Sequence, residues 1–233
     1  MIDLSIVVLC YHSGKTIVPF FYELEELLKE LSVGYETVLV ANDFAESKDE
    51  TVSIVKELAK EYPHVIPITK IKEGMMGWDM LQGMNACNGK YICVIDGDGQ
   101  FPIKSVVDVY KTIVSTQSDI VKTYRNKRDD GAYRHLLSSV YNFIFNWLYP
   151  GLHSKDVNSK PKIMSRETYA ALKLESTDWF IDAEIMIKAR KLKLKIGEIP
   201  IAFSANESRK SFVRIGAIAE FMWNLITFKF KKF

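Results

Sequence analysis

Strand-like and helix-like segments alternate along the first 96 residues, and this alternation restricts the fold more than any other feature of the sequence. Four short, continuously apolar runs predict buried strands. They occupy residues 4–11, 35–42, 64–69 and 90–96. Between them, apolar side chains recur at helical spacing in residues 15–31, 51–61 and 77–87. The alternation predicts an α/β fold with a Rossmann-like, mixed but mostly parallel sheet and helices on both faces.

The second half of the sequence is less regular. Strands are predicted at 119–124, 162–165 and 195–203, and helices at 133–149 and 181–192. Residues 125–131 are predicted to form a polar loop, and Ser47 with Glu50 resembles a capping box before the second helix. A chain of 233 residues is long enough for one such domain and short for two. We expect a single domain over residues 1–212 and an amphipathic helix over 213–233.

The cysteines and the N-terminus bear on the cellular compartment. Cys10, Cys87 and Cys93 lie in apolar segments and form no CxxC pair, which is typical of buried thiols in a reducing compartment. The N-terminus leads straight into a strand, so no signal peptide is predicted. No run reaches the roughly 18 apolar residues of a membrane-spanning helix. These features predict a cytoplasmic protein.

Charge is distributed unevenly along the chain. Residues 1–119 hold 10 Lys and Arg against 18 Asp and Glu, a net charge of −8, whereas residues 120–233 hold 21 against 11, a net charge of +10. A basic second half favours an anionic partner, such as phosphates or a membrane surface. Nucleic acid is disfavoured because the basic residues accompany no recognised nucleic-acid-binding motif.

The stretch VIDGDGQFP places two carboxylates at the end of the fourth predicted strand. Asp96 and Asp98 are one residue apart, and carboxylate oxygens are the ligands that Mg²⁺ and Mn²⁺ prefer. Gly97 and Gly99 allow the backbone to approach a ligand closely. An acidic surface turn is the alternative. Because ligands of parallel sheets bind at the carboxyl ends of the strands, we expect Asp43 to line the same crevice as these two carboxylates.

Several segments together resemble family 2 glycosyltransferases, which are inverting enzymes of GT-A fold that use nucleotide sugars. The resemblance is to the branch with dolichyl- and undecaprenyl-phosphate sugar transferases and covers about residues 3–203. Its motifs are VIDGDGQFP, SIVVLCYHSGKTI, VLVANDFAESKDET and KEGMMGWDMLQGMNACNGKYICVIDGDG. The resemblance implies that Asp96 and Asp98 hold Mg²⁺ or Mn²⁺ and the sugar diphosphate. The other residues that it implies in donor binding are Tyr11, His12, Asp43, Gly77, Gly97 and Gln100.

Two departures from the family pattern affect the nucleotide pocket. His12-Ser13 stands where Asn-Glu is usual, and Asn42-Asp43 replaces a pair of aspartates. His12 is therefore either a nucleotide contact or a histidine bonded to the backbone at a strand end. The choice between UDP and GDP stays open.

Two basic segments resemble phosphate-binding parts of the family. Arg125 and Arg134 suit phosphate oxygens, and exposed charges paired with Asp129 and Asp130 are the alternative. The second segment, NESRKSFVR, resembles a loop that closes over the diphosphate. Its matching residues are Arg209, Lys210 and Ser211.

The stretch WFIDAEIMIKA resembles the part of the family that lies near the acceptor. Asp182 or Glu184 could serve as the general base that a hydroxyl acceptor needs. A phosphate acceptor needs no base, because its second pKa is near ~6 and it is already anionic at neutral pH. The alternative for these carboxylates is a favourable position at a helix N-terminus.

Two aromatic segments predict contact with a membrane surface. Residues 215–230 form an amphipathic pattern that ends in lysines, and residues 139–149 are rich in aromatic side chains. Packing against the sheet or against a subunit partner is the alternative for both.

These features predict an inverting transferase that moves a sugar from a nucleotide-diphosphate sugar to a polyprenyl phosphate, with Asp98, Asp182, Glu184, Arg125 and Arg134 as the catalytic candidates. We expect the protein to bind peripherally at the cytoplasmic face of the membrane, and homo-oligomer formation stays open. The alternatives are transfer to a hydroxyl of a glycan, nucleotidyl transfer, or a degenerate nucleotide-sugar-binding scaffold.

Overall fold

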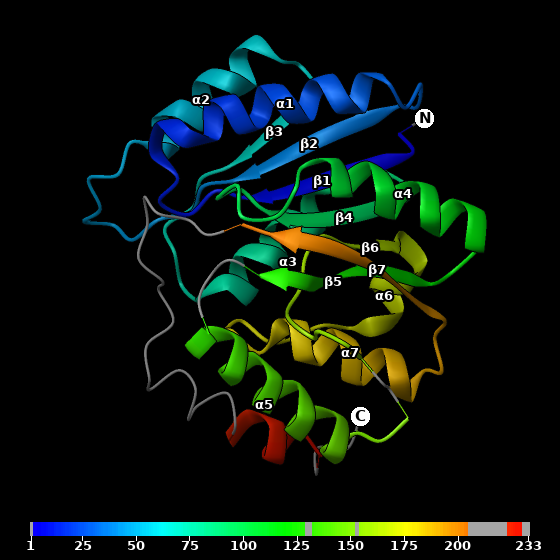
Figure 1. Ribbon diagram of the computed structural model, residues 1–233. Helices are drawn as coiled ribbons and strands as arrows, with labels where there is room; N and C mark the ends of the chain where they lie inside the picture. The colour runs from blue at the N-terminus through cyan, green and yellow to red at the C-terminus, as the bar shows by residue number, and fades with distance from the viewer. Residues whose placement is uncertain (1, 129–131, 152–153, 205–222, 230–233) are drawn as a thin grey trace.

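The protein folds around one seven-stranded sheet with the strand order β3-β2-β1-β4-β6-β5-β7 (Figure 1). The computed structural model describes residues 2–128, 132–151, 154–204 and 223–229. The strands are β1 (Leu4–Leu9), β2 (Tyr35–Val40), β3 (Val65–Ile68), β4 (Tyr91–Asp96), β5 (Ile120–Arg128), β6 (Lys162–Ser165) and β7 (Ile196–Phe203). The helices are η1 (Gly14–Thr16), α1 (Ile17–Lys29), α2 (Thr51–Glu61), α3 (Met76–Ala86), α4 (Lys104–Thr116), α5 (Ala132–Leu148), α6 (Arg166–Leu172) and α7 (Ile181–Lys191).

The sheet is mixed but mostly parallel, as predicted. Strand β1 pairs in parallel with β2 and β4, and β2 pairs in parallel with β3. Strand β6 runs antiparallel to both of its neighbours. Strand β7 forms the edge of the sheet and pairs in parallel with β5. Strands β1, β2 and β4 are buried on both faces, which explains why each is a continuous apolar run rather than an alternating one. Strand β3 lies at the edge of the sheet and is only partly buried.

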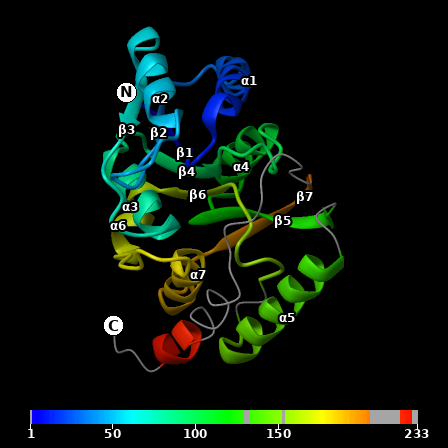
Figure 2. The ribbon, with the colours of Figure 1, turned by 90° about the vertical axis from the view of Figure 1, so that its left-hand side faces the viewer.

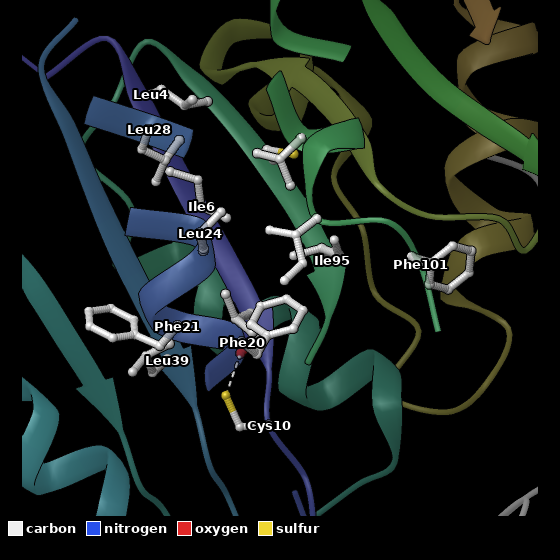
Figure 3. Close-up of a cluster of buried hydrophobic side chains, with 14 of the residues drawn as sticks. Leu4, Ile6, Cys10, Phe20, Phe21, Leu24, Leu28, Leu39, Ile95 and Phe101 are labelled. Carbon is white, nitrogen blue, oxygen red and sulfur yellow. Dashed lines mark hydrogen bonds between the residues drawn. The ribbon is translucent and has the colours of Figure 1, made fainter. Parts of the chain in front are cut away.

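Helices cover both faces of the sheet (Figure 2). On one face, Leu4, Ile6 and Val8 of β1 pack against α1, α2 and α4, and Figure 3 shows part of this core. On the other face, Val7 and Leu9 pack against α3, α6 and α7. Helix α5 and the helical residues 223–229 pack on the outer side of α7 and form a third cluster.

Four expectations from the sequence differ from the structure. Residues 125–128 are not a loop, because β5 continues through them and pairs with β7 up to Phe203. Helices α4 and α6 were not predicted. The capping box does not form, since Ser47 Oγ accepts the Asp49 N–H at 3.2 Å and the N-cap of α2 is Glu50.

The three cysteines are buried free thiols, as predicted. Burial raises the pKa of Cys87 to about 12, so this side chain behaves as a packing group. None of the helices in the described residues is both long and apolar enough to cross a bilayer. The predicted boundary between residues 212 and 213 lies outside the described residues, although 223–229 are helical.

Candidate active site

The carboxyl ends of β1, β2 and β4 lie side by side and position the predicted site. In the register of the sheet, Leu9 of β1 pairs with both Val40 of β2 and Asp96 of β4. The loops that follow these strands therefore leave the sheet at one edge. This arrangement brings Asp96 and Asp43 to the same region, as the strand-end argument predicts. It also brings the segment after β1 there, which that argument did not name.

His12 and Asp43 form a pair at this edge. The His12 Nε2 atom lies 3.1 Å from Asp43 Oδ1, and the same carboxylate accepts hydrogen bonds from the Ser47 hydroxyl and the Phe44 N–H. Burial alone would raise the pKa of Asp43, but the hydrogen bonds from Ser47, His12 and Phe44 outweigh it and lower the pKa. Asp43 is therefore an ionised acceptor with a fixed orientation.

The Tyr11 ring joins this pair. It stacks on the His12 ring with 4.1 Å between the ring centroids, and the Lys72 ammonium lies 4.4 Å from the Tyr11 centroid. Lys72 is itself paired with the buried Asp79. The structure thus brings Tyr11, His12 and Asp43 together into one small polar and aromatic surface, while their contact with a nucleotide stays a prediction.

The turn after β4 is held tightly by backbone contacts. The Gly97 N–H donates to the Leu9 carbonyl at 2.9 Å, and a Cβ atom at Gly97 would lie 2.9 Å from a Val8 methyl group. Asp98 Oδ1 accepts the Gln100 N–H at 3.1 Å. Only glycine fits at position 97 without displacing β1, so the sequence of this turn fixes where the two aspartates lie.

Gln100 connects this turn to the end of β7. Its carbonyl accepts the Ser204 N–H at 3.0 Å, and its side-chain amide donates to the Ser204 carbonyl at 3.2 Å. The segment with Arg209, Lys210 and Ser211 lies outside the described residues. Ser204, the last described residue before it, contacts the turn that carries Asp98.

A buried lysine contacts Asp96, and the sequence analysis missed it. Lys160 Nζ lies 3.4 Å from Asp96 Oδ1 and 3.2 Å from Asp182 Oδ2, and Lys162 Nζ lies 2.6 Å from Asp182 Oδ1. Burial alone would lower the pKa of Lys160, but Asp182 and Asp96 raise it above its ordinary value. The sequence signal for this contact was the pair Lys160 and Lys162 at the start of β6, next to its apolar residues.

Asp182 and Glu184, the two candidates for the general base that a hydroxyl acceptor would need, are buried in different surroundings. Asp182 is 1% exposed and lies between Lys160 and Lys162. Burial alone would raise the pKa of Asp182, but the two lysines lower it. Glu184 accepts the Glu175 and Ser176 N–H groups and pairs with Lys188, so it supports the preceding loop. Its placement disfavours a role as general base.

Of Arg125 and Arg134, which were predicted to bind phosphate, the structure describes the side chain of Arg125. Arg125 forms a bidentate ion pair with Asp156, with Nε 2.6 Å from Oδ2 and the terminal nitrogen 2.9 Å from Oδ1. Its guanidinium also lies 5.1 Å from the Phe203 ring centroid. Arg125 therefore joins β5 to the loop before β6. The side chain of Arg134 lies outside the described residues.

Gly77 contacts the loop before α7, and its expected role in donor binding stays a prediction. Its N–H donates to the Asp178 carbonyl at 2.9 Å. A Cβ atom there would lie 2.5 Å from the carbonyl oxygens of Asp178 and Ser176. Gly77 thus lets the start of α3 pack against the loop before α7.

Gly77→Ala should destabilise the fold by about 1–3 kcal/mol because of this close approach. Alanine is intrinsically the better helix former by about 1 kcal/mol, so helix propensity alone predicts the opposite sign. Urea unfolding of the two proteins measures the difference. A variant as stable as the wild type would show that the loop moves freely away from α3.

The aspartates suit a metal that takes its other ligands from a substrate. Among the described residues, no group of three or more His, Cys, Asp or Glu side chains is placed to hold a metal ion. Asp96 and Asp98 offer two carboxylates at the edge of the sheet, and the Asp96 side chain is 26% exposed. Mg²⁺ is commonly held in this way by one or two carboxylates together with substrate phosphates and water.

A mostly parallel sheet with an Asp-X-Asp turn at its carboxyl edge is the arrangement that the resemblance to GT-A glycosyltransferases predicts. The sequence profile of Glycosyl transferase family 2 matches residues 5–172, well over half of the chain. The chain belongs to this family of glycosyltransferases.

Three curated relatives are dolichyl-phosphate beta-glucosyltransferases. The protein from Trichomonas vaginalis is 26% identical over 96% of this chain and 72% of its own length. Those from Dictyostelium discoideum and Saccharomyces cerevisiae are 26% and 25% identical, over 80% and 93% of this chain. The chain spans 60% of the Dictyostelium protein and 71% of the yeast protein.

Solved structures with the same fold are more distant in sequence. Glucosyl-3-phosphoglycerate synthase from Mycobacterium tuberculosis, in complex with Mn²⁺, UDP and its product, superposes with a TM-score of 0.72 at 13% identity over 97% of this chain and 79% of its own. Mannosyl-3-phosphoglycerate synthase from Rubrobacter xylanophilus gives 0.74 at 16% identity over 98% and 73%. At these low sequence identities, the structural similarity shows that the proteins share a fold.

Proposed function

We propose that this glycosyltransferase moves a sugar, with inversion, from a nucleotide-diphosphate sugar to a polyprenyl phosphate. The observation that carries the proposal is the placement of Asp96 and Asp98 beside the His12–Asp43 pair at one edge of the sheet. The names of the curated relatives, which are dolichyl-phosphate beta-glucosyltransferases, support the lipid phosphate as acceptor.

In this proposal, each part of the site has a distinct task. Tyr11, His12 and Asp43 bind the nucleoside, with the Asp43 carboxylate as the hydrogen-bond acceptor. Asp96 and Asp98 hold Mg²⁺ or Mn²⁺, and the Mn²⁺ and UDP bound in the Mycobacterium structure support a divalent metal. Such a metal, when bound, neutralises charge on the leaving diphosphate.

The surroundings of the acidic candidates favour a phosphate acceptor over a hydroxyl. A hydroxyl acceptor needs a base that reaches it, but Asp182 is enclosed by two lysines and Glu184 by backbone N–H groups. A phosphate acceptor needs neither carboxylate, because it is already anionic at neutral pH. Transfer to a glycan hydroxyl is therefore the second candidate.

A donor panel tests the proposal directly. The purified chain is incubated with Mn²⁺ or Mg²⁺ and a series of UDP- and GDP-sugars, with and without polyprenyl phosphate, and nucleotide release is measured. Lipid-dependent release of one nucleotide would support the proposal and identify the donor. If the protein neither binds nor consumes any nucleotide sugar, the proposed reaction is wrong and a scaffold role becomes the better explanation.

An exposed apolar surface on α5 and residues 223–229 supports contact with a membrane. Phe143 and Trp147 of α5 are each 73% exposed, and Trp223 of the neighbouring helix is 66% exposed. The two helices lie side by side in both views, and the Tyr149 hydroxyl donates to the Leu225 carbonyl (Figure 1, Figure 2). We propose that this aromatic surface inserts into the headgroup region, where tryptophan is favoured.

Trp147→Ser should weaken binding to anionic phospholipid vesicles about tenfold, since inserting one large apolar side chain is worth about 1.5–3 kcal/mol. Cosedimentation with the vesicles measures this binding. Tyr22→Ser is the matched control, because Tyr22 is an exposed aromatic on α1, away from α5 in both views. Equal binding of the two variants would assign the aromatic surface to another partner, such as a second subunit.

A further inference from the structure

We propose that Lys160 is a fixed cation of the donor site that shares Asp96 with the divalent metal, so that metal binding depends on the arrival of the diphosphate. The inference rests on the proposed function in one respect, because the diphosphate is taken to be that of the nucleotide sugar. It concerns a residue that the sequence motifs do not include, and it makes a prediction about metal affinity that needs no turnover.

The position of the ammonium carries the argument. Lys160 Nζ lies 3.4 Å from Asp96 Oδ1 and 3.5 Å from Asp96 Oδ2, so it lies in front of both oxygens of the carboxylate. A metal ion that binds Asp96 has to use one of these oxygens. The ammonium and the metal therefore compete for the same carboxylate.

The lysine is held in place and cannot withdraw into solvent. Its side chain is 3% exposed, and Nζ also contacts Asp182 Oδ2 at 3.2 Å and the Met76 sulfur at 3.3 Å. The Lys160 carbonyl accepts the Thr123 hydroxyl at 2.5 Å, which ties the backbone to β5. Lys160 is therefore a permanent part of the site rather than a mobile surface charge.

The charge balance explains why Lys160 needs Asp96. Asp182 lies between two ammonium groups, those of Lys160 and Lys162, and its single negative charge cannot neutralise both. Asp96 supplies the second negative charge. A divalent metal at Asp96 would face an ammonium within a few ångströms, and this repulsion persists because the ammonium is buried.

An incoming diphosphate changes that balance. Its oxygens are anionic ligands for the metal and hydrogen-bond acceptors for an ammonium, so it can neutralise both cations at once. The free protein should therefore bind metal weakly, chiefly through Asp98, and should bind it more tightly with a nucleoside diphosphate. In this arrangement Lys160 couples metal binding to donor binding.

Mn²⁺ titration without nucleotide tests the inference. Lys160→Met keeps the length of the side chain and leaves Asp182 paired with Lys162, so we expect it to fold. It should bind Mn²⁺ about tenfold more tightly than the wild type, because the competing charge is gone. Added UDP or GDP should then improve Mn²⁺ affinity by a smaller factor in this variant than in the wild type.

Two further variants control for charge and for burial. Lys160→Arg keeps the positive charge and should bind Mn²⁺ as weakly as the wild type. Lys188→Met removes another buried, ion-paired lysine, on α7 beside Glu184, and should leave Mn²⁺ affinity unchanged. Thermal unfolding of every variant confirms that the comparison is made between folded proteins.

The inference is wrong if Lys160→Met and the wild type bind Mn²⁺ equally, or if neither binds it. It is also wrong if Lys188→Met tightens Mn²⁺ binding as much as Lys160→Met does. Failure of the proposed function would look different, because the wild type would then accept no nucleotide sugar whatever its Mn²⁺ affinity.

Discussion

Replacement of Asp98 by asparagine should lower the rate of sugar transfer by about a thousandfold, a loss of about 4 kcal/mol of transition-state stabilisation. The side chain lies at the carboxyl edge of the sheet, one residue beyond Gly97. Its Oδ1 atom accepts the Gln100 N–H, and the amide oxygen of asparagine can accept the same hydrogen bond. The substitution therefore removes the negative charge that we propose holds the metal, and it leaves the turn intact.

The measurement is the initial rate of transfer over a range of Mn²⁺ concentrations, together with the thermal unfolding midpoint. We expect that midpoint to change by no more than about 2 °C, as for a surface substitution. Asp108→Asn on α4 is the control, since it removes a carboxylate of the same type outside the site. Retention of a tenth or more of the activity by Asp98→Asn would show that the metal does not depend on this carboxylate.

The strand-end argument succeeded because it needs only the order of elements. Buried parallel strands give continuous apolar runs, and their carboxyl ends meet at one edge whatever the details of packing. This is why Asp43 and Asp96 were correctly predicted to lie at one edge of the sheet. The segment with Tyr11 and His12 was assigned to the site by the family resemblance, not by this argument. The resemblance to the family implied the ligands of these residues, but it did not supply their geometry.

The polar part of β5 shows where such reasoning fails. The sequence RNKR resembles a loop because three of its four side chains are charged and the fourth is polar. In the structure the strand continues, since Arg125 forms an ion pair with Asp156 and packs over the Phe203 ring. Local sequence cannot show that a charge will be neutralised by a residue 31 positions away.

The surroundings of the carboxylates on α7 and the burial of the two lysines could not be predicted from the sequence, for a related reason. Asp182 and Glu184 are two residues apart on a helix, so they point in different directions and cannot form one site. Which of them faces Lys160 depends on how α7 packs against the sheet. Lys160 and Lys162 read as surface residues, since lysine is rarely buried without a partner, and only the fold reveals Asp182 as that partner.

Replacement of Asp182 by asparagine should lower the free energy of unfolding by about 3–5 kcal/mol, the usual cost of removing one partner from a buried ion pair. The carboxylate lies 2.6 Å from Lys162 Nζ and 3.2 Å from Lys160 Nζ, and all three side chains are almost fully buried. The neutral amide would leave two ammonium groups without their shared counter-ion. Urea unfolding near neutral pH measures the loss.

Two comparisons separate this effect from a general loss of charge. Glu26→Gln removes a carboxylate from the exposed pair with Lys29 and should cost less than about 1 kcal/mol. Adding Lys162→Met to Asp182→Asn should cost less than the sum of the two single substitutions, because the second change removes the unpaired charge. Simple additivity, or a loss under about 1 kcal/mol for Asp182→Asn, would contradict the idea that this carboxylate holds the lysines.

The pH dependence of that loss gives a second test. Burial lowers the pKa of Lys162 to about 8, although Asp182 raises it. Between about pH 8 and the ordinary lysine value, the unfolded chain binds more protons at this residue than the folded protein, so its contribution to stability increases with pH. At about pH 9.5, Lys162 is already neutral in the folded wild type, so removing its partner costs less. The penalty of Asp182→Asn should therefore be smaller there than near neutral pH, whereas a purely steric effect of the amide would be the same at both.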